Sequence, residues 1–145
     1  MNRDLASEGW TEIDRGGFAG YVGPLWTRST PEGHRQLAVI MDERHANQRG
    51  VMHGGMMMTL LDQALGMHLT AQGPMMNATI QLDTHFLAPA RIGDCVEVTA
   101  EIVRETRSMA FMAARAMVGD RLIATARGVW ARRDPLEAQQ GEGQR

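Results

Sequence analysis

The residues best suited to catalysis or ligand binding lie between Asn47 and Leu69, where a polar loop leads through two glycines into an apolar helix. Gly54 and Gly55 allow the backbone to turn sharply or to approach a ligand closely, because they carry no Cβ. The first N–H groups of the helix lack intrahelical partners and carry the positive end of its dipole. They can therefore receive a developing oxyanion or a thioester carbonyl.

Asp62 is the one residue between Gly54 and Leu82 that must carry charge at neutral pH. An unpaired carboxylate is costly to bury, so it is rarely placed on an apolar helix for stability. No basic residue lies three or four positions away from Asp62 along the helix. We therefore interpret Asp62 as a candidate catalytic group, with an exposed or arginine-paired helix residue as the alternative.

The composition of the chain limits the classes of protein to which it can belong. The chain has 145 residues, 43% of them hydrophobic and 22% charged, which is typical of one folded domain. Its net charge of −2 gives no reason to expect nucleic-acid binding. All 15 basic residues are arginines, which excludes a Schiff-base lysine and a phosphate-loop lysine. The sequence shows no apolar run of membrane-helix length and no apolar signal core, so we predict a cytoplasmic protein without membrane partners.

The other metal-binding and nucleophilic residue types indicate no second chemistry. The single cysteine, Cys95, lies in an apparent strand, where a buried structural thiol is the ordinary interpretation. His45, His53 and His68 lack a paired spacing of the kind that hydrolytic zinc sites use. We therefore expect no metal.

Hydrophobic periodicity predicts two strands, one long helix and four further strands. The predicted strands before the helix are Phe18–Thr30, interrupted at Gly23-Pro24, and His34–Met41. The predicted helix runs from about Gly55 to Ala71, and the later strands are Met76–Leu87, Asp94–Glu105, Met109–Val118 and Arg121–Arg132. Gly119-Asp120 is typical of a tight hairpin turn.

This order of elements predicts an α+β fold, in which one antiparallel sheet wraps around the central helix. Apolar residues cover most of the helix circumference, so the helix should be nearly enclosed by protein. An open sheet leaves edges, and pairing them in a dimer is a natural solution. We assign residues 1–17 to an N-terminal arm that Trp10 and Ile13 could attach, 18–134 to the domain, and 135–145 to a disordered tail.

The run NQRGVMHGGMMMTLLDQALG, followed by TIQLDTHFLAPARIGD, resembles the hotdog-fold acyl-CoA thioesterases of the phenylacetate-degradation (PaaI-like) type. The family signature is an Asn, a Gly, a His-Gly-Gly and then an Asp on the central helix, followed by a Thr or Ser and a Pro-Ala pair. In this chain Asn47 lies six residues before His53, and Asp62 lies nine residues after it. The match extends from about Leu37 to Trp130. Two departures are His85 and the methionine-rich helix start.

The resemblance implies hydrolysis of an acyl-CoA thioester by a hotdog dimer, and a dimer of dimers is expected. In that scheme the N–H of Gly54 or Gly55 polarises the thioester carbonyl. Asp62 acts as general base on water or as nucleophile, with the site completed across the dimer interface, and Thr79 positions the water. The sequence leaves general-base and covalent catalysis equally open, because both need the same carboxylate.

The resemblance also assigns Asn47 to orienting the water or the thioester, and His53 to holding the loop and contacting substrate. The residues by themselves leave alternatives, since Asn47 suits a turn, His53 a loop brace and Thr79 an ordinary strand position.

Coenzyme A enters as part of the substrate, so no separate cofactor is expected. Candidates for binding its phosphates are Arg91, Arg104, Arg107 and Ser108, with solvated surface residues as the alternative. Met58 is a candidate for the acyl pocket, because methionine adapts to irregular apolar partners. Two other functions remain open, a hotdog hydratase or dehydratase and a non-catalytic acyl-CoA-binding domain.

Overall fold

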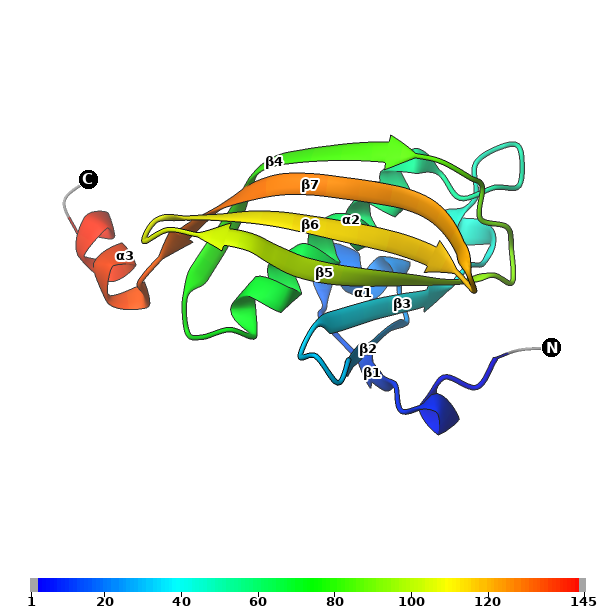
Figure 1. Ribbon diagram of the computed structural model, residues 1–145, viewed down its shortest axis with the longest axis horizontal. Coiled ribbons are helices and arrows are strands. Elements are labelled where there is room, and N and C mark those ends of the chain that lie inside the picture. Colours follow the sequence, from blue (N-terminus) through cyan, green and yellow to red (C-terminus); the bar gives the residue numbers. More distant parts are fainter. Residues whose placement is uncertain (1–2, 144–145) are drawn as a thin grey trace.

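The computed structural model describes residues 3–143, which form a seven-stranded antiparallel sheet curved around one long helix (Figure 1). The order of strands in the sheet is β1-β2-β3-β5-β6-β7-β4, so β1 and β4 are its edges. The strands are β1 (Thr11–Ile13), β2 (Leu25–Ser29), β3 (Arg35–Ile40), β4 (Met76–Phe86), β5 (Cys95–Glu105), β6 (Met109–Val118) and β7 (Arg121–Arg133). The helices are η1 (Ala6–Glu8), α1 (Gly17–Val22), η2 (Glu43–His45), α2 (Gly54–Thr70) and α3 (Pro135–Glu142). The predicted α+β fold, in which one antiparallel sheet wraps around a central helix, is confirmed.

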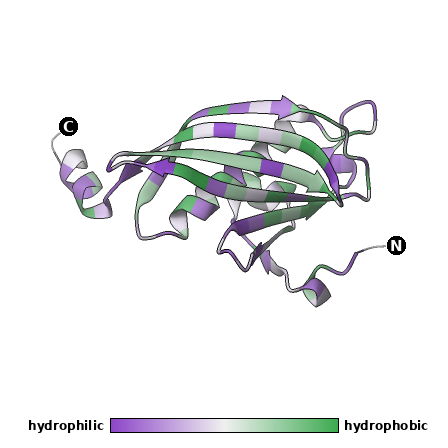
Figure 2. Cartoon of the chain, viewed as in Figure 1, coloured by the Kyte–Doolittle hydropathy of each residue, from purple (hydrophilic) through white to green (hydrophobic). Residues whose placement is uncertain are grey.

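The central helix α2 packs against one face of the sheet, where it contacts β3, β4, β5 and β6. Its residues Leu60, Leu61 and Leu65 are at most 1% exposed, as the nearly continuous apolar circumference predicts. Hydrophobic and hydrophilic residues alternate along β5, whereas β6 is hydrophobic over most of its length (Figure 2). The buried residues of β5, β6 and β7 share one core with α2. Within the described residues, no helix combines the length and the apolar character needed to span a membrane.

The N-terminal arm covers part of the outer face of the sheet, which we define as the face opposite α2. Leu5 and Trp10 are 1% and 3% exposed, and they form a second, smaller buried cluster with Ala38 and Cys95. Burial under this arm raises the pKa of the Cys95 thiol, which suits the predicted structural role. The prediction that Trp10 attaches the arm is therefore confirmed.

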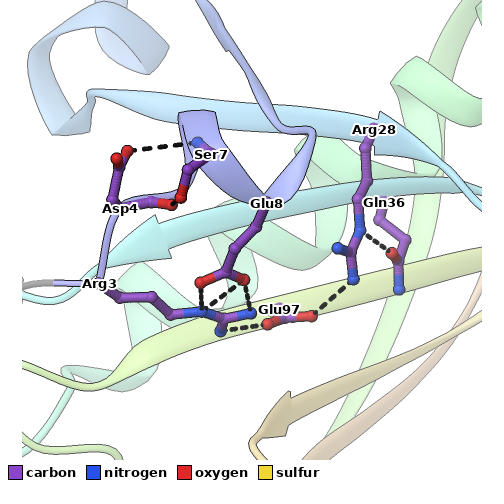
Figure 3. Close-up of polar contacts among 7 residues, drawn as sticks. All are labelled: Arg3, Asp4, Ser7, Glu8, Arg28, Gln36 and Glu97. Carbon is purple, nitrogen blue, oxygen red and sulfur yellow. Dashed lines mark hydrogen bonds and ion pairs between the residues drawn. The ribbon is translucent and has the colours of Figure 1, made fainter.

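Charged residues also fasten the arm to the sheet (Figure 3). The guanidinium of Arg3 donates to the carboxylates of Glu8 and Glu97, which lie on the arm and on β5. Arg28 of β2 donates to the opposite oxygen of Glu97, and its guanidinium lies 4.2 Å from the centre of the Trp10 ring. Glu97 thus links the arm to two strands, so the arm is an integral part of the domain.

The segment before Pro24 is helix α1, and the predicted strand over these residues is wrong. Gly16 and Gly17 have φ values of 62° and 53°, a left-handed conformation that turns the chain out of the sheet. The residues of α1 that face the core, Ala19 and Val22, are three positions apart, which is a helical spacing. The strand begins only after Pro24, as β2.

The tail is also more ordered than predicted. Residues 135–142 form α3, and its side-chain cap is Asp134, whose carboxylate accepts the Leu136 N–H at 2.8 Å. Pro135 occupies the first turn, where its missing N–H costs nothing. The prediction of a disordered tail is therefore wrong for residues 135–142. Residues 144–145 of the predicted tail and residues 1–2 of the predicted arm lie outside the described residues.

Candidate active site

The N-terminus of α2 is held by the residue that precedes it. The His53 Nδ1 accepts the Gly55 N–H at 2.9 Å, so this side chain caps the helix. Gly55 therefore cannot offer its N–H to a ligand without displacing His53. The Gly54 N–H has no acceptor among residues 3–143, so it is the donor that remains for a substrate carbonyl.

An apolar pocket of about 360 Å³ opens beside this free N–H. A Cβ on Gly54 would lie 3.5 Å from the ring of Phe86, an ordinary van der Waals distance, so the ring lies directly beside the helix start. Phe86 itself is 56% exposed at the end of β4. The other lining residues include Met52, Met57 and Ile123. A thioester carbonyl at Gly54 would thus lie next to apolar walls.

Asn47 organises the loop that leads to the helix. Its side-chain oxygen accepts the Arg49 N–H at 2.8 Å, and its own N–H donates to the Val51 carbonyl at 2.8 Å. Asn47 therefore stabilises a turn, which is the alternative role that the sequence left open for it. It uses only the amide oxygen, and the side-chain NH₂ has no acceptor within the described part of the chain. That group can still donate to a substrate.

His45 anchors the same loop from inside the protein, a role that the sequence patterns did not reveal. Its side chain is 1% exposed. The ring accepts the Asp42 N–H at Nδ1 (3.0 Å), which leaves a proton on Nε2 to donate to the Val22 carbonyl at 2.7 Å. Its own carbonyl accepts the His53 N–H at 2.8 Å. His45 therefore joins α1 to the residue that caps α2.

Asp62 lies two turns further along α2 and is bonded to β4. The Thr79 hydroxyl donates to the Asp62 Oδ1 at 2.6 Å, which holds the half-buried carboxylate in one orientation. Thr79 pairs with Trp130 of β7, and a bulge follows it before Gln81. The bulge locally re-aims side chains on β4. Asp62 and Thr79 line one pocket of about 240 Å³.

The two groups of predicted catalytic residues do not meet within one chain. Gly54 and Asp62 are eight positions apart on α2, so the helix rise separates their Cα atoms by about 12 Å. They line different pockets. We call the helix start with Asn47, His53 and Gly54 the carbonyl half-site, and Asp62 with Thr79 the carboxylate half-site.

The remaining predicted binding residues are dispersed. Arg91 lies near the carbonyl half-site, because its backbone forms a bridge with Val51. Arg107 and Ser108 line a third pocket of about 750 Å³, next to α3, and Arg107 pairs with Glu137 at 2.8 Å. Met58 is 36% exposed on α2 and lines neither half-site pocket. The structure therefore brings only Arg91 close to either half-site.

Comparison with known proteins identifies the architecture. Residues 49–125 match the model of the thioesterase superfamily. A Pseudomonas aeruginosa protein named as an esterase is 36% identical over 111 residues, which cover 75% of this chain and 83% of that protein. Human acyl-coenzyme A thioesterase 13 is 26% identical over 96 residues, covering 65% of this chain and 68% of the human protein.

The similarity extends to solved structures. The Escherichia coli PaaI protein from the phenylacetic acid degradation operon aligns with a TM-score of 0.75, at 21% identity, over 83% of this chain and 86% of that one. At this level of identity the likeness is one of fold.

Proposed function

Since the chain belongs to the thioesterase superfamily of hotdog-fold, PaaI-like hydrolases, we propose that it converts an acyl- or aryl-CoA thioester to the free acid and coenzyme A. The observation that carries this proposal is the pair of complementary half-sites. One presents an N–H at the start of a helix with no acceptor among the described residues, and the other presents a carboxylate held by a hydroxyl group. Thioester hydrolysis needs both, an oxyanion donor and a group that activates water.

A second copy of the chain would bring the two half-sites together. Reacting groups must approach within about 3–3.5 Å, whereas the half-sites of one chain are separated by two turns of α2. The edge strand β4, which carries Thr79, has no partner on its outer side within the described chain. Met76, Ile80 and Phe86 are each 56% exposed along it, as expected for a surface that a partner covers.

In the proposed two-fold dimer, the carbonyl half-site of one protomer faces the carboxylate half-site of its partner. The Gly54 N–H and the free Asn47 amide donate to the thioester oxygen, which becomes negative as water attacks. Asp62, held by Thr79, takes the proton from that water as its oxygen bonds to the carbonyl carbon. The carbon–sulfur bond then breaks, and the proton passes to the thiolate of coenzyme A. We also predict that two such dimers associate into a tetramer, and light scattering would test this by measuring the mass in solution.

Thiol release from a panel of acyl-CoA substrates tests the proposal. Asp62→Asn should lower kcat by about 10²–10⁴-fold while the protein stays folded, because the amide cannot accept a proton. Asp120→Asn, in the exposed turn between β6 and β7, is the matched control and should retain wild-type turnover. Near-normal activity of Asp62→Asn would refute the assigned role. Binding of acyl-CoA by the wild type without thiol release would indicate a binding domain instead.

A further inference from the structure

The pocket that holds Asp62 contains a second charged residue, Arg15, which comes from the N-terminal arm. Arg15 and Asp62 are the only charged residues that line this pocket in the described chain. We propose that Arg15 binds a carboxylate at the end of a short acyl chain, so that the preferred substrates are ω-carboxyacyl-CoA thioesters. This inference rests on the proposed thioesterase function and specifies its substrate class.

The backbone around Arg15 is fixed by contacts on both sides. Ile13, two residues before it, packs against the main core. The Asp14 carboxylate accepts the Gly16 N–H at 2.9 Å, and Gly16 has a φ of 62° that an L-residue rarely adopts. Arg15 therefore lies next to a defined turn, and it lines one pocket with residues of α2. The Arg15 side chain starts from a defined position and not from a freely moving arm.

The helix that follows Arg15 is fastened to the loop of the carbonyl half-site. Arg44 donates to the Tyr21 and Gly23 carbonyls at 2.8 Å and 2.6 Å, and His45 donates to the Val22 carbonyl. The same loop carries Asn47 and His53. Arg15 is thus positioned by elements that also position the catalytic groups.

The Arg15 guanidinium has no ion-pair or hydrogen-bond partner among residues 3–143. Asp62 does not supply one, because no ion pair joins the two side chains and the Asp62 carboxylate accepts from the Thr79 hydroxyl at 2.6 Å. A substrate carboxylate entering this pocket would be repelled by Asp62 if Asp62 were the only charge there. Arg15 offsets that repulsion, and its planar fork can bind a carboxylate through two hydrogen bonds.

The size and lining of the pocket suit a short polar chain. A volume of about 240 Å³ corresponds to about eight water-sized groups, which is comparable to an acyl chain of a few carbons with a terminal carboxylate. Gln63, Thr70 and Asn77 line it, whereas the pocket beside Gly54 is mostly apolar. Thr70 and Asn77 already bond to each other at 2.9 Å, and the Gln63 amide has no partner within the described chain.

The phosphates of coenzyme A are a second group in the substrate whose negative charge Arg15 could bind. They are separated from the thioester sulfur by the whole pantetheine arm, whereas Arg15 lines the pocket of the reacting carboxylate. A group that reaches Arg15 while the thioester lies beside Asp62 therefore belongs to the acyl chain. Inhibition by free coenzyme A separates the two sources experimentally.

The test compares matched thioesters in a thiol-release assay, namely succinyl- with butyryl-CoA and glutaryl- with valeryl-CoA. The wild type should prefer the carboxylated member of each pair. Arg15→Gln should lower kcat/KM for that member by about 10- to 100-fold, the effect of one charged hydrogen-bonding group. It should leave the uncharged member within about twofold and inhibition by free coenzyme A unchanged. Arg15→Lys should restore part of the preference, and Arg115→Gln, at an exposed arginine on β6, is the control.

Three results would overturn the inference while leaving the thioesterase function intact. These are a wild type without preference for the carboxylated substrates, an equal loss for both members of a pair in Arg15→Gln, and weaker inhibition by free coenzyme A in that variant. A wild type that hydrolyses none of the four thioesters, nor any other acyl-CoA, would instead refute the thioesterase function itself.

Discussion

Complementation between two inactive variants provides the sharpest test of a shared site. Asn47→Ala damages the carbonyl half-site, and Asp62→Asn damages the carboxylate half-site. In a heterodimer of these two variants, both lesions fall in one of the two sites, and the other site receives an intact Asn47 and an intact Asp62. Each heterodimer should therefore recover about half of the wild-type kcat, although each homodimer has little activity.

The assay requires co-expression with two different affinity tags, sequential purification of the heterodimer and measurement of thiol release. A heterodimer of Asp62→Asn with Thr79→Ala is the matched control, because both lesions lie in the carboxylate half-site and damage both sites. It should show no recovery beyond the residual activity of the site that carries Thr79→Ala. If the Asn47→Ala and Asp62→Asn heterodimer also showed no recovery, the half-sites would act within one chain, and the two-fold arrangement would be wrong.

Three further predictions follow from single contacts. Thr79→Ala should lower kcat by about 10-fold or more with little change in KM, because the 2.6 Å hydrogen bond that orients the carboxylate is lost; steady-state kinetics tests this. Gly128→Ala should destabilise the fold by about 3 kcal/mol in urea denaturation, since its Cβ would lie 2.5 Å from the Gln81 carbonyl oxygen, and Gly73→Ala, with no atom within 4 Å, should have little effect. Burial lowers the pKa of His68 below its ordinary value of 6.5, so the folded state binds fewer protons. The free energy of unfolding should therefore fall as pH drops from 6.5 through the lower folded-state pKa, and His68→Gln should flatten that dependence.

The long elements of the fold were predictable because their periodicity is long and regular. The α2 helix and the strands β4–β7 lie within two residues of their predicted bounds. The short α1 was misread, because six residues contain too few turns to show a helical period. Its helical state depends on the turn at Gly16 and Gly17 and on packing of Val22 in the core. The α3 helix was missed since it has no apolar periodicity, although Asp134-Pro135 is a start signal that could have indicated it.

The site was predictable only in part. Motif spacing and the family resemblance made Asp62, Thr79, Asn47 and Gly54 candidates, and the structure shows that the first two are directly bonded. The sequence could not choose between the N–H groups of Gly54 and Gly55, because that choice depends on the His53 ring. It gave no signal for Arg15, which reaches the Asp62 pocket from a segment distant along the chain.

By itself, the sequence determined the long elements of the fold and a set of candidate catalytic groups. Helical and strand periods are local properties, and the types and spacing of Asn47, His53, Gly54 and Asp62 are readable along the chain. Tertiary structure decided which of these groups are free and which groups meet. Asp62 bonds to Thr79 because β4 packs beside α2, and the carbonyl half-site is separated from it because both lie on one rigid helix. These contacts and separations involve residues that are far apart in the sequence, so they are set only when the chain folds.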